Sequence, residues 1–463
     1  MSRPVIVFAS VVVVAVARTA APQAPAPPNE PANPTQEVAS ETPAGPAIVV
    51  GPTEIRIGGY LGITGISRST NAGGSPATTF GSIPYDNTLQ GNVSETRLSA
   101  QPSRLSIRVN AAPAPDRSTL AGYFEMDFAG TVPGNVAITA SSVEFRLRHA
   151  FGEAQFHRTF LVAAGQAYSL MTPAAAQLSI WPSDYELTYA VDLNYVAGTV
   201  WDRTPQVRFT YRPSSAFNWA LSIENPEQQI GSAVKLPACC TADLQAEYNT
   251  GGNGLAVPNM MPDIVSRVAF NTSPAFHLDA GGVFRMFRST IAPYDQSTHQ
   301  PGGGVTVNAR TTLGATKVIG QFAYGPGIGR YLGGLAPDVT FGADGSIHPV
   351  RAGSWVAGVE QRLTPTVSVA GYDSGVHADA SFATDANGTL VGFGYPGSPN
   401  SNNRSIHEVT GVFAWQPWKI AGRGSMQWNT QLSWLQRTPW SVSGGPSSAD
   451  AWMLLTQIRY NLP

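Results

Sequence analysis

The 463-residue chain carries little charge and almost no lysine. Only 13% of its residues are charged, whereas a typical soluble domain has about 25%. Three of its 28 basic residues are lysines (Lys235, Lys317 and Lys419), and the net charge of −2 provides no basic surface for nucleic acid. The two cysteines, Cys239 and Cys240, are adjacent. No metal-ligand spacing accompanies them, so they form either a vicinal disulfide or a loop pair without a catalytic role.

The sequence also lacks an apolar run long enough for a membrane-spanning helix. The longest run, residues 5–17, is shorter than the roughly 20 residues that such a helix needs. It follows Arg3 and ends in the small-residue pattern AVA, which predicts a secretory signal peptide over residues 1–20. Residues 21–53 are rich in alanine and proline with few large apolar side chains. This composition predicts a disordered periplasmic linker.

Strand-like alternation is what the rest of the chain contains. In the stretch TLAGYFEMDF, residues 119–128, one face is apolar and the other carries Glu125 and Asp127. A period of two is the signature of a β-strand. A soluble sandwich produces this pattern with its apolar face on the core. A transmembrane barrel produces it too, with the apolar face on lipid and the polar face on a wet lumen.

The connections between such segments favour the barrel. Segments of about 9–12 residues, such as RLSIRVN and SMQWNTQLSW, recur along the chain, and this is the length that a tilted strand needs to cross a bilayer. Short turns and long loops alternate between them, as in outer-membrane barrels. We therefore predict an all-β transmembrane antiparallel barrel of about 16 strands over residues 54–463. Its long loops are extracellular, and its last strand closes against its first, which removes the sheet edges.

Sixteen strands enclose a channel that side chains alone do not fill. The long loop at residues 170–198 is predicted to fold inward as a constriction loop that presents acids and aromatics to the barrel wall. Its candidate site residues are Trp181, Asp184, Tyr185, Glu186 and Asp192.

The facing wall is predicted to be basic. On the parity of the lumen, the predicted pore constriction contains Arg104, Arg108, Glu125, Asp127, Glu144, Arg146, Arg148, Arg208 and Arg212, with Arg203 close by. Guanidinium groups bind carboxylates bidentately and stay charged. The alternative is that these arginines pair with the lumen acids, Glu224 included, merely to make the lumen rigid. His149 is assigned to the lipid parity or to an interface.

No catalytic motif is present. The sequence has no nucleophile elbow, no histidine spacing typical of a metal site and no phosphate loop before a helix. We therefore predict no catalytic residues, no cofactor and no metal, and a protein that is not an enzyme.

Several segments resemble the DcaP-like trimeric outer-membrane porins: RLSAQPSRLSIRVNA (97–111), AGYFEMDFAG (121–130), EFRLRHAFGEA (144–154), GTVWDRTPQVRFTYR (198–212) and the ending IRYNLP. The resemblance implies a sixteen-stranded trimeric barrel that admits small anions, dicarboxylates especially, past an arginine-lined constriction. The arginines that stand where such residues are expected are Arg104, Arg108, Arg146, Arg148, Arg208 and Arg212. Members of that family can carry an N-terminal coiled coil, whereas residues 18–50 here have no heptads and many prolines.

The sequence thus predicts a porin of the bacterial outer membrane for passive diffusion of small hydrophilic solutes, with a preference for small anions such as dicarboxylates. The expected partners are these solutes, outer-membrane lipid and lipopolysaccharide, and two further copies in a homotrimer; nucleic acid is not one of them. The alternatives are a non-selective general porin, and a structural or receptor barrel that acts through its surface loops.

Overall fold

The computed structural model describes residues 47–73, 75–131, 143–157, 159–251, 254–442 and 445–463. The chain divides into two units, Met1–Pro31 and Ala32–Pro463, and all described residues belong to the second. The first unit, the predicted signal peptide and most of the predicted linker lie outside the described residues. Residues 48–50, at the end of that linker, form the short strand β1 (Ile48–Val50) against β2 (Thr53–Arg68). No helix in the described ranges is long and apolar enough to span a membrane.

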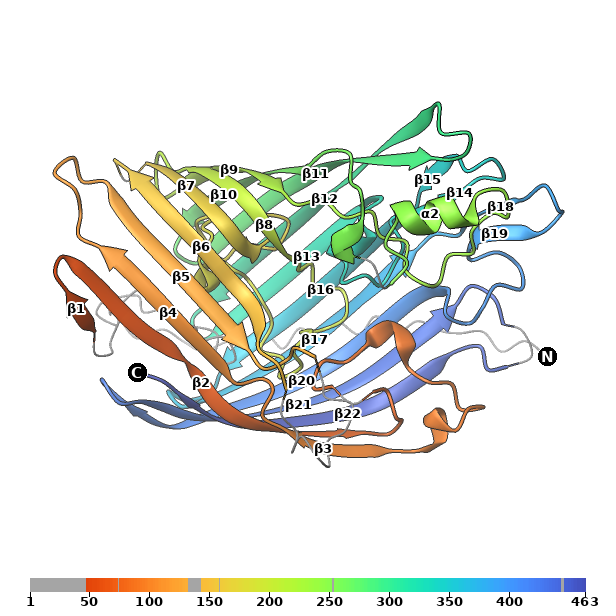
Figure 1. Cartoon of the computed structure of the whole chain (residues 1–463). Helices are drawn as coiled ribbons and strands as arrows, with labels where there is room; N and C mark the ends of the chain where they lie inside the picture. The colour runs from red at the N-terminus through yellow and green to blue at the C-terminus, as the bar shows by residue number, and fades with distance from the viewer. Residues whose placement is uncertain (1–46, 74, 132–142, 158, 252–253, 443–444) are drawn as a thin grey trace. The chain divides into compact units, whose positions relative to one another are not determined.

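One antiparallel sheet organises the second unit (Figure 1). Besides β1 and β2, its strands are β3 (Glu95–Ser99), β4 (Arg104–Ala111), β5 (Thr119–Asp127), β6 (Arg146–Phe156), β7 (Phe160–Tyr168), β8 (Arg203–Tyr211), β9 (Phe217–Glu224), β10 (Asp263–Ser273), β11 (Phe276–Thr290), β12 (Ser297–Leu313), β13 (Thr316–Pro326), β16 (Arg351–Arg362), β17 (Val367–Ala378), β20 (Asn403–Ile420), β21 (Gly424–Pro439) and β22 (Ala449–Asn461).

The sheet closes on itself, as predicted. Strand β2 pairs with β22 from Tyr60↔Asn461 to Arg68↔Met453, so the last strand meets the first. On its other side β2 pairs with both β3 and β4, which are two halves of one interrupted strand. Of the 18 strands in the sheet, β1 is a short addition and β3 and β4 count as one, which leaves a closed barrel of 16.

The two faces of the wall differ as the sequence pattern predicts. On β5, Phe124 is 37% exposed on the outside, whereas Glu125 and Asp127 are 1% and 0% exposed on the inside. Large apolar side chains are likewise exposed along the outer faces of other strands, for example Ile63, Phe322 and Leu432. This outer apolar band is what a bilayer requires of a barrel.

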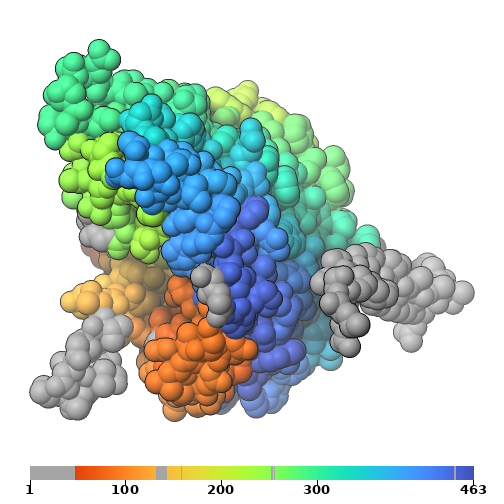
Figure 2. Space-filling model, turned by 90° about the vertical axis from the view of Figure 1, so that its right-hand side faces the viewer, coloured from red at the N-terminus to blue at the C-terminus, as the bar shows by residue number. Residues whose placement is uncertain are grey.

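Loops are sorted by length between the two ends of the barrel. The turns at one end are short, for example residues 314–315 between β12 and β13 and 421–423 between β20 and β21. Long loops occupy the other end, which is therefore the extracellular one. Figure 2 views this end, with parts of loops 69–94 (orange) and 379–402 (blue) on its surface.

These long loops hold the remaining elements: η1 (Phe80–Ser82), η2 (Gln90–Asn92), η3 (Pro182–Asp184), α2 (Thr241–Glu247), η4 (Gly254–Ala256), η5 (Gly329–Tyr331), the hairpin of β14 (Val339–Phe341) with β15 (Ile347–Pro349), and the hairpin of β18 (Ser381–Thr384) with β19 (Leu390–Phe393). Cys239 and Cys240, at the start of α2, are bonded as a disulfide.

A bulge in β6 changes which residues face the lumen. Glu125 pairs with His149, but the next residue of β5, Met126, pairs with Leu147, so Arg148 is the extra residue of the bulge. The bulge moves the following residues by one position relative to β5. His149 and Phe151 are consequently buried inside the barrel, at 0% and 6% exposure. The sequence-based assignment of His149 to the lipid parity or to an interface was wrong, because strict alternation does not anticipate a bulge.

Candidate pore constriction

The long loop after β7 lies inside the barrel. We call residues 169–202 the constriction loop; most of its side chains are buried. Several of its backbone N–H groups donate to side chains of distant strands. Tyr189 N donates to Tyr372 Oη on β17 at 2.8 Å, and Val191 N donates to Gln431 Oε1 on β21 at 2.6 Å. Ala197 N donates to Glu408 on β20 at 2.7 Å. The loop therefore crosses the lumen.

The wall next to β7 holds the base of the loop through two buried arginines. Arg208 on β8 donates to the carbonyl oxygens of Tyr168 and Ser179 at 2.7 and 2.9 Å. Arg267 on β10 donates to the carbonyl oxygens of Leu170 and Met171 at 2.9 and 2.8 Å. Arg208 was predicted to bind solute. Because its guanidinium already binds loop carbonyls, its observed contacts position the loop.

The end of the loop approaches the wall closely at a glycine. Gly198 has φ +91°, and a Cβ atom there would lie 2.4 Å from Gly375 O and 2.7 Å from Trp355 O. Only glycine combines this backbone conformation with so close a contact. Gly198 therefore fixes how near the loop lies to β16 and β17.

The acids of the loop do not face the basic wall, contrary to the sequence-based expectation. Asp184 accepts three backbone N–H bonds from its own loop, the closest from Ser179 at 2.6 Å. Glu186 pairs with Lys317 on β13 at 2.9 Å. Asp192 accepts from Thr78 N at 3.1 Å, in loop 69–94, and burial raises the pKa of its carboxyl. Local hydrogen bonds thus hold Asp184, whereas contacts with residues distant in sequence hold Glu186 and Asp192.

The aromatic residues of the loop pack against the basic side. Trp181 lies edge-on to Tyr123 and Phe151, with ring centroids 5.6 and 5.1 Å apart, and Arg108 lies 4.2 Å above its ring. The Tyr185 hydroxyl donates to the carbonyl oxygens of Tyr168 and Ile180. Burial raises the pKa of Tyr185 to about 12. These rings fill the space between the loop and β5–β7.

A cluster of arginines and acids forms the basic wall on β4, β5, β6 and the start of β8. We use this name for Arg104, Arg146, Arg148 and Arg203 with Glu125 and Asp127. Arg148 pairs with both acids, and Arg146 pairs with Asp127 at 2.7 Å. Arg104 approaches Glu125 only to 4.0 Å. The cluster thus holds four guanidinium groups against two carboxylates.

Two of these arginines have unused hydrogen-bonding capacity. Arg104 Nε is buried without an acceptor. The Arg203 guanidinium lies 5.7 Å from the Tyr168 ring centroid and 5.5 Å from that of Trp201, and no carboxylate of the described residues lies within ion-pair distance of it. A small pocket opens beside Arg104 and is lined by Arg104, Glu125, Arg148, His149, Tyr168, Pro182 and Leu187.

Two other predicted site residues lie at the margins. Arg212 donates to Gln177 O and Oε1 at 3.2 and 3.0 Å and is therefore bound to the constriction loop. Glu144 precedes β6 and is exposed, although it was predicted on the lumen face of a strand. Its backbone pairs with Gly130 and Thr131, so it belongs to the loop between β5 and β6. Residues 132–142 of this loop lie outside the described residues.

A second charged cluster, the balanced wall, faces the far side of the constriction loop. It consists of Lys317 and Arg310 with Glu186 and Glu360. Lys317 Nζ lies 2.9 Å from Glu186 and 2.6 Å from Glu360, and Arg310 lies 3.5 Å from Glu186. Two cations therefore meet two anions. Glu224, considered as an arginine partner, instead accepts from Leu170 N at 2.8 Å.

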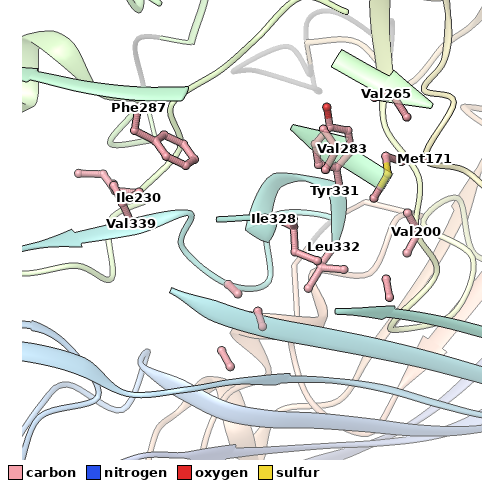
Figure 3. Packing of buried hydrophobic residues seen from close by; sticks show 14 of the residues in the cluster. Met171, Val200, Ile230, Val265, Val283, Phe287, Ile328, Tyr331, Leu332 and Val339 are labelled. Atoms are coloured by element: carbon pink, nitrogen blue, oxygen red, sulfur yellow. The ribbon is translucent and has the colours of Figure 1, made fainter. Parts of the chain in front are cut away.

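Part of the barrel interior is a packed apolar core. Figure 3 shows Val265, Val283 and Phe287 of the wall beside Met171 and Val200 of the constriction loop, together with loop residues Ile230, Ile328, Tyr331, Leu332 and Val339. All are buried. Apolar packing of loops on β10 and β11 supports the constriction loop from behind, so the polar passage is narrower than the barrel.

Sequence reasoning did not identify Lys317, Tyr168 or His149 as site residues. Lys317 is one of only three lysines in the chain, and the rarity of lysine was the signal that could have identified it. No sequence pattern marked Tyr168, because it is the last residue of β7. Arg203 was noted only as a neighbour, although its position beside Tyr168 makes it a member of the basic wall.

Solved structures resemble this fold. The model aligns with the crystal structure of the outer membrane channel DcaP of Acinetobacter baumannii at a TM-score of 0.63 and 16% identity, over 89% of this chain and 99% of that one. The chain has the fold of this channel. Two others align at lower TM-scores of 0.46 and 10% identity: a loop-deletion mutant of OmpT, an outer membrane protein of Vibrio cholerae (89% and 99% covered), and Salmonella typhi OmpF (90% and 100%).

No protein-family model matches the sequence, and no curated protein matches it significantly. At 16% identity the DcaP likeness concerns the fold, so the function has to be argued from the site.

Proposed function

We propose that this protein is a passive diffusion channel of the bacterial outer membrane that favours small anions, dicarboxylates especially. The closed barrel, its outer apolar band and the sorting of its loops support a channel of this kind. The structural neighbour DcaP, named as an outer membrane channel, supports the same location and role.

The observation that carries the anion preference is the charge excess of the basic wall. Its four guanidinium groups have only two carboxylate partners, and both of these are bonded to Arg148. The cluster therefore keeps two positive charges in excess, since Arg104 approaches Glu125 only to 4.0 Å and Arg203 has no carboxylate within ion-pair distance among the described residues. Positive charge in a narrow passage with low-dielectric walls attracts anions and repels cations.

The preference for carboxylates follows from the chemistry of arginine. A guanidinium group offers a planar fork of donors that matches a carboxylate, and it remains charged at every relevant pH. Arg203 lies 5.7 Å from the Tyr168 ring centroid, and Arg104 lines the same pocket as Tyr168, so we infer that a solute with two carboxylates contacts both arginines. This geometry favours short dicarboxylates over monoanions.

A general porin without useful selectivity is the second candidate. The balanced wall favours it, because Lys317 and Arg310 are offset by Glu186 and Glu360. The anion-selective channel and the general porin differ in whether the excess positive charge of the basic wall determines which ions pass.

Conductance under a salt gradient separates these candidates. The purified chain in a planar bilayer, with unequal KCl on the two sides, is expected to give a reversal potential of the sign for anion passage. Added succinate is expected to block the current in a saturable manner. Open pores with no reversal potential would instead support the general porin, and a folded barrel without conductance would support a structural or receptor role.

We further propose that the chain assembles as a homotrimer and contacts outer-membrane lipid and lipopolysaccharide. The sequence resemblance to trimeric porins supports the assembly, and the outer apolar band supports the lipid contact. Native mass spectrometry of the detergent-extracted protein is expected to give the trimer mass. A monomer mass in several mild detergents, with conductance retained, would contradict the trimer without affecting the channel.

A further inference from the structure

The outer surface carries an unusual polar cluster near the extracellular ends of β16, β17 and β20. Asp373 on β17 points outward and is 54% exposed. It accepts from Trp355 Nε1 on β16 at 2.9 Å and lies 2.7 Å from His407 Nε2 on β20. Trp434 on β21 lies against His407, with ring centroids 5.9 Å apart. We call these four residues the outer girdle.

Two exposed arginines lie closer to the extracellular end than the outer girdle. Arg351 begins β16, and Arg404 lies at the start of β20. The end of β17 runs between them, since Asp379 N donates to Arg351 O and His377 pairs with Ser405. Two strand spacings place the backbones of the two arginines about 10 Å apart. Both can therefore reach one ligand.

Neither arginine has a carboxylate partner among the described residues. Arg404 lies only over the ring of Trp440, at 5.9 Å. The two nearby acids contact histidines instead: Asp379 lies 3.2 Å from His377 Nε2, and Asp373 contacts His407. Two unpaired guanidinium groups on an exposed surface attract an anion with several oxygens, such as a phosphate.

The surface on the periplasmic side of the outer girdle is apolar. Val359, Val409 and Leu432 follow on β16, β20 and β21, at 47%, 45% and 51% exposure, and Phe413 continues the band at 42%. From the extracellular end toward the periplasmic side, this face therefore presents first cationic side chains, then an aromatic and polar band, and then an apolar surface. An amphiphile with an anionic headgroup and acyl chains matches this order.

We propose that Arg351 and Arg404 form a binding site for the phosphorylated headgroup of an outer-leaflet lipid, whose acyl chains lie along Val359, Val409 and Leu432. This site rests on the proposed outer-membrane location but not on the anion selectivity of the pore. Trp355 and Trp434 fix the depth at which the headgroup meets the wall. Asp373 orients Trp355 and His407 through its two contacts.

The test uses the full chain, purified in detergent and checked for the heat-modifiable mobility of a folded barrel. Native mass spectrometry measures binding of bisphosphorylated lipid A, of dephosphorylated lipid A and of inorganic phosphate. The double variant Arg351→Gln/Arg404→Gln, which we call the rim variant, removes both guanidinium groups. The matched control Arg362→Gln/Arg423→Gln removes two exposed arginines from the other end of the barrel.

We expect the dissociation constant for bisphosphorylated lipid A to rise about thirtyfold in the rim variant, given the contribution of each of the two arginines near an anionic surface. The control variant is expected to match the unmodified chain, and dephosphorylated lipid A is expected to bind weakly to all three. Equal binding of phosphorylated lipid A by the rim variant would overturn the site. Displacement by millimolar inorganic phosphate would also overturn it, in favour of a free-anion site.

Two further outcomes would refute the lipid. Equal binding of both forms of lipid A would show that the apolar band alone holds it. A dimer or trimer that dissociates only in the rim variant would show that the face binds a second copy of the chain. Conductance and reversal potential, measured on the same samples, are expected to be unchanged, so failure of the lipid site and failure of the channel function remain distinguishable.

Discussion

The basic wall and the balanced wall lie on opposite sides of the constriction loop and differ in how their charges are used. On the balanced wall, Lys317 lies within 3 Å of both Glu186 and Glu360, and the loop is thereby attached to β13 and β16. On the basic wall, Arg146 and Arg148 use up both acids, while Arg104 and Arg203 remain in excess. One wall is built for attachment, and the other retains charge for solutes.

The largest effect is expected from removing the excess charge. Arg104→Gln/Arg203→Gln leaves the Arg148 pairs intact and should lower the ratio of anion to cation permeability about tenfold, because the passage loses the charge that repels cations. Reversal potentials measured in a KCl gradient give this ratio.

The matched control acts on the other wall. Lys317→Met/Glu360→Gln removes one cation and one anion together and should leave the permeability ratio unchanged. If the control variant loses selectivity as strongly as the basic-wall variant, the distinction between the two walls is invalid.

The next largest effect concerns stability. Lys317→Met alone leaves Glu186 and Glu360 with only Arg310 nearby, so one buried carboxylate lacks its partner. Loss of one member of a buried ion pair costs about 3 kcal/mol. Denaturant unfolding in lipid vesicles should show this loss, and the double variant with Glu360→Gln should recover most of it. Equal stability of the single variant and the unmodified chain would mean that the cluster is solvated.

A smaller effect is expected at the contact between the constriction loop and loop 69–94. Asp192→Ala removes the acceptor of Thr78 N and Asn194 N. Two backbone donors lose their partner, which costs about 1–2 kcal/mol, and the loop gains freedom at that point. Single-channel recordings should show more open-channel noise with unchanged ion selectivity. Altered selectivity would place Asp192 in the charge balance of the passage instead.

The barrel could be predicted from the sequence because its rules are local. Alternation along β5 assigned Glu125 and Asp127 to the inside, and the alternation of short and long connections gave both the strand number and the orientation. These patterns repeat in every strand, so individual errors cancel. The same locality explains the failure at His149, where one inserted residue in β6 reverses the faces.

The candidate site was less predictable because its partners are distant in sequence. Parity placed Arg148 and Arg208 inside the barrel but could not distinguish Arg148, which binds two acids, from Arg208, which binds carbonyl oxygens of the constriction loop. The acids of that loop carried no signal for their partners either: Glu186 meets Lys317 only through the path of the loop across the lumen.

The smallest effect expected is a pH dependence from Tyr185, which packs on the basic-wall side of the loop. Burial raises its pKa to about 12 from an ordinary value of about 10. A folded pKa above the unfolded one means that the neutral phenol stabilises the fold fully below pH 10, and that this contribution is lost as the pH rises toward 12. Tyr185→Phe should cost about 1 kcal/mol at pH 8 through its lost hydrogen bonds. Denaturant midpoints should therefore show the gap between the two proteins narrowing between pH 10 and 12, since all other groups titrate equally in both. A constant gap would mean that the phenol is solvated when ionised, and that the loop packs less tightly on the basic wall than on the balanced one.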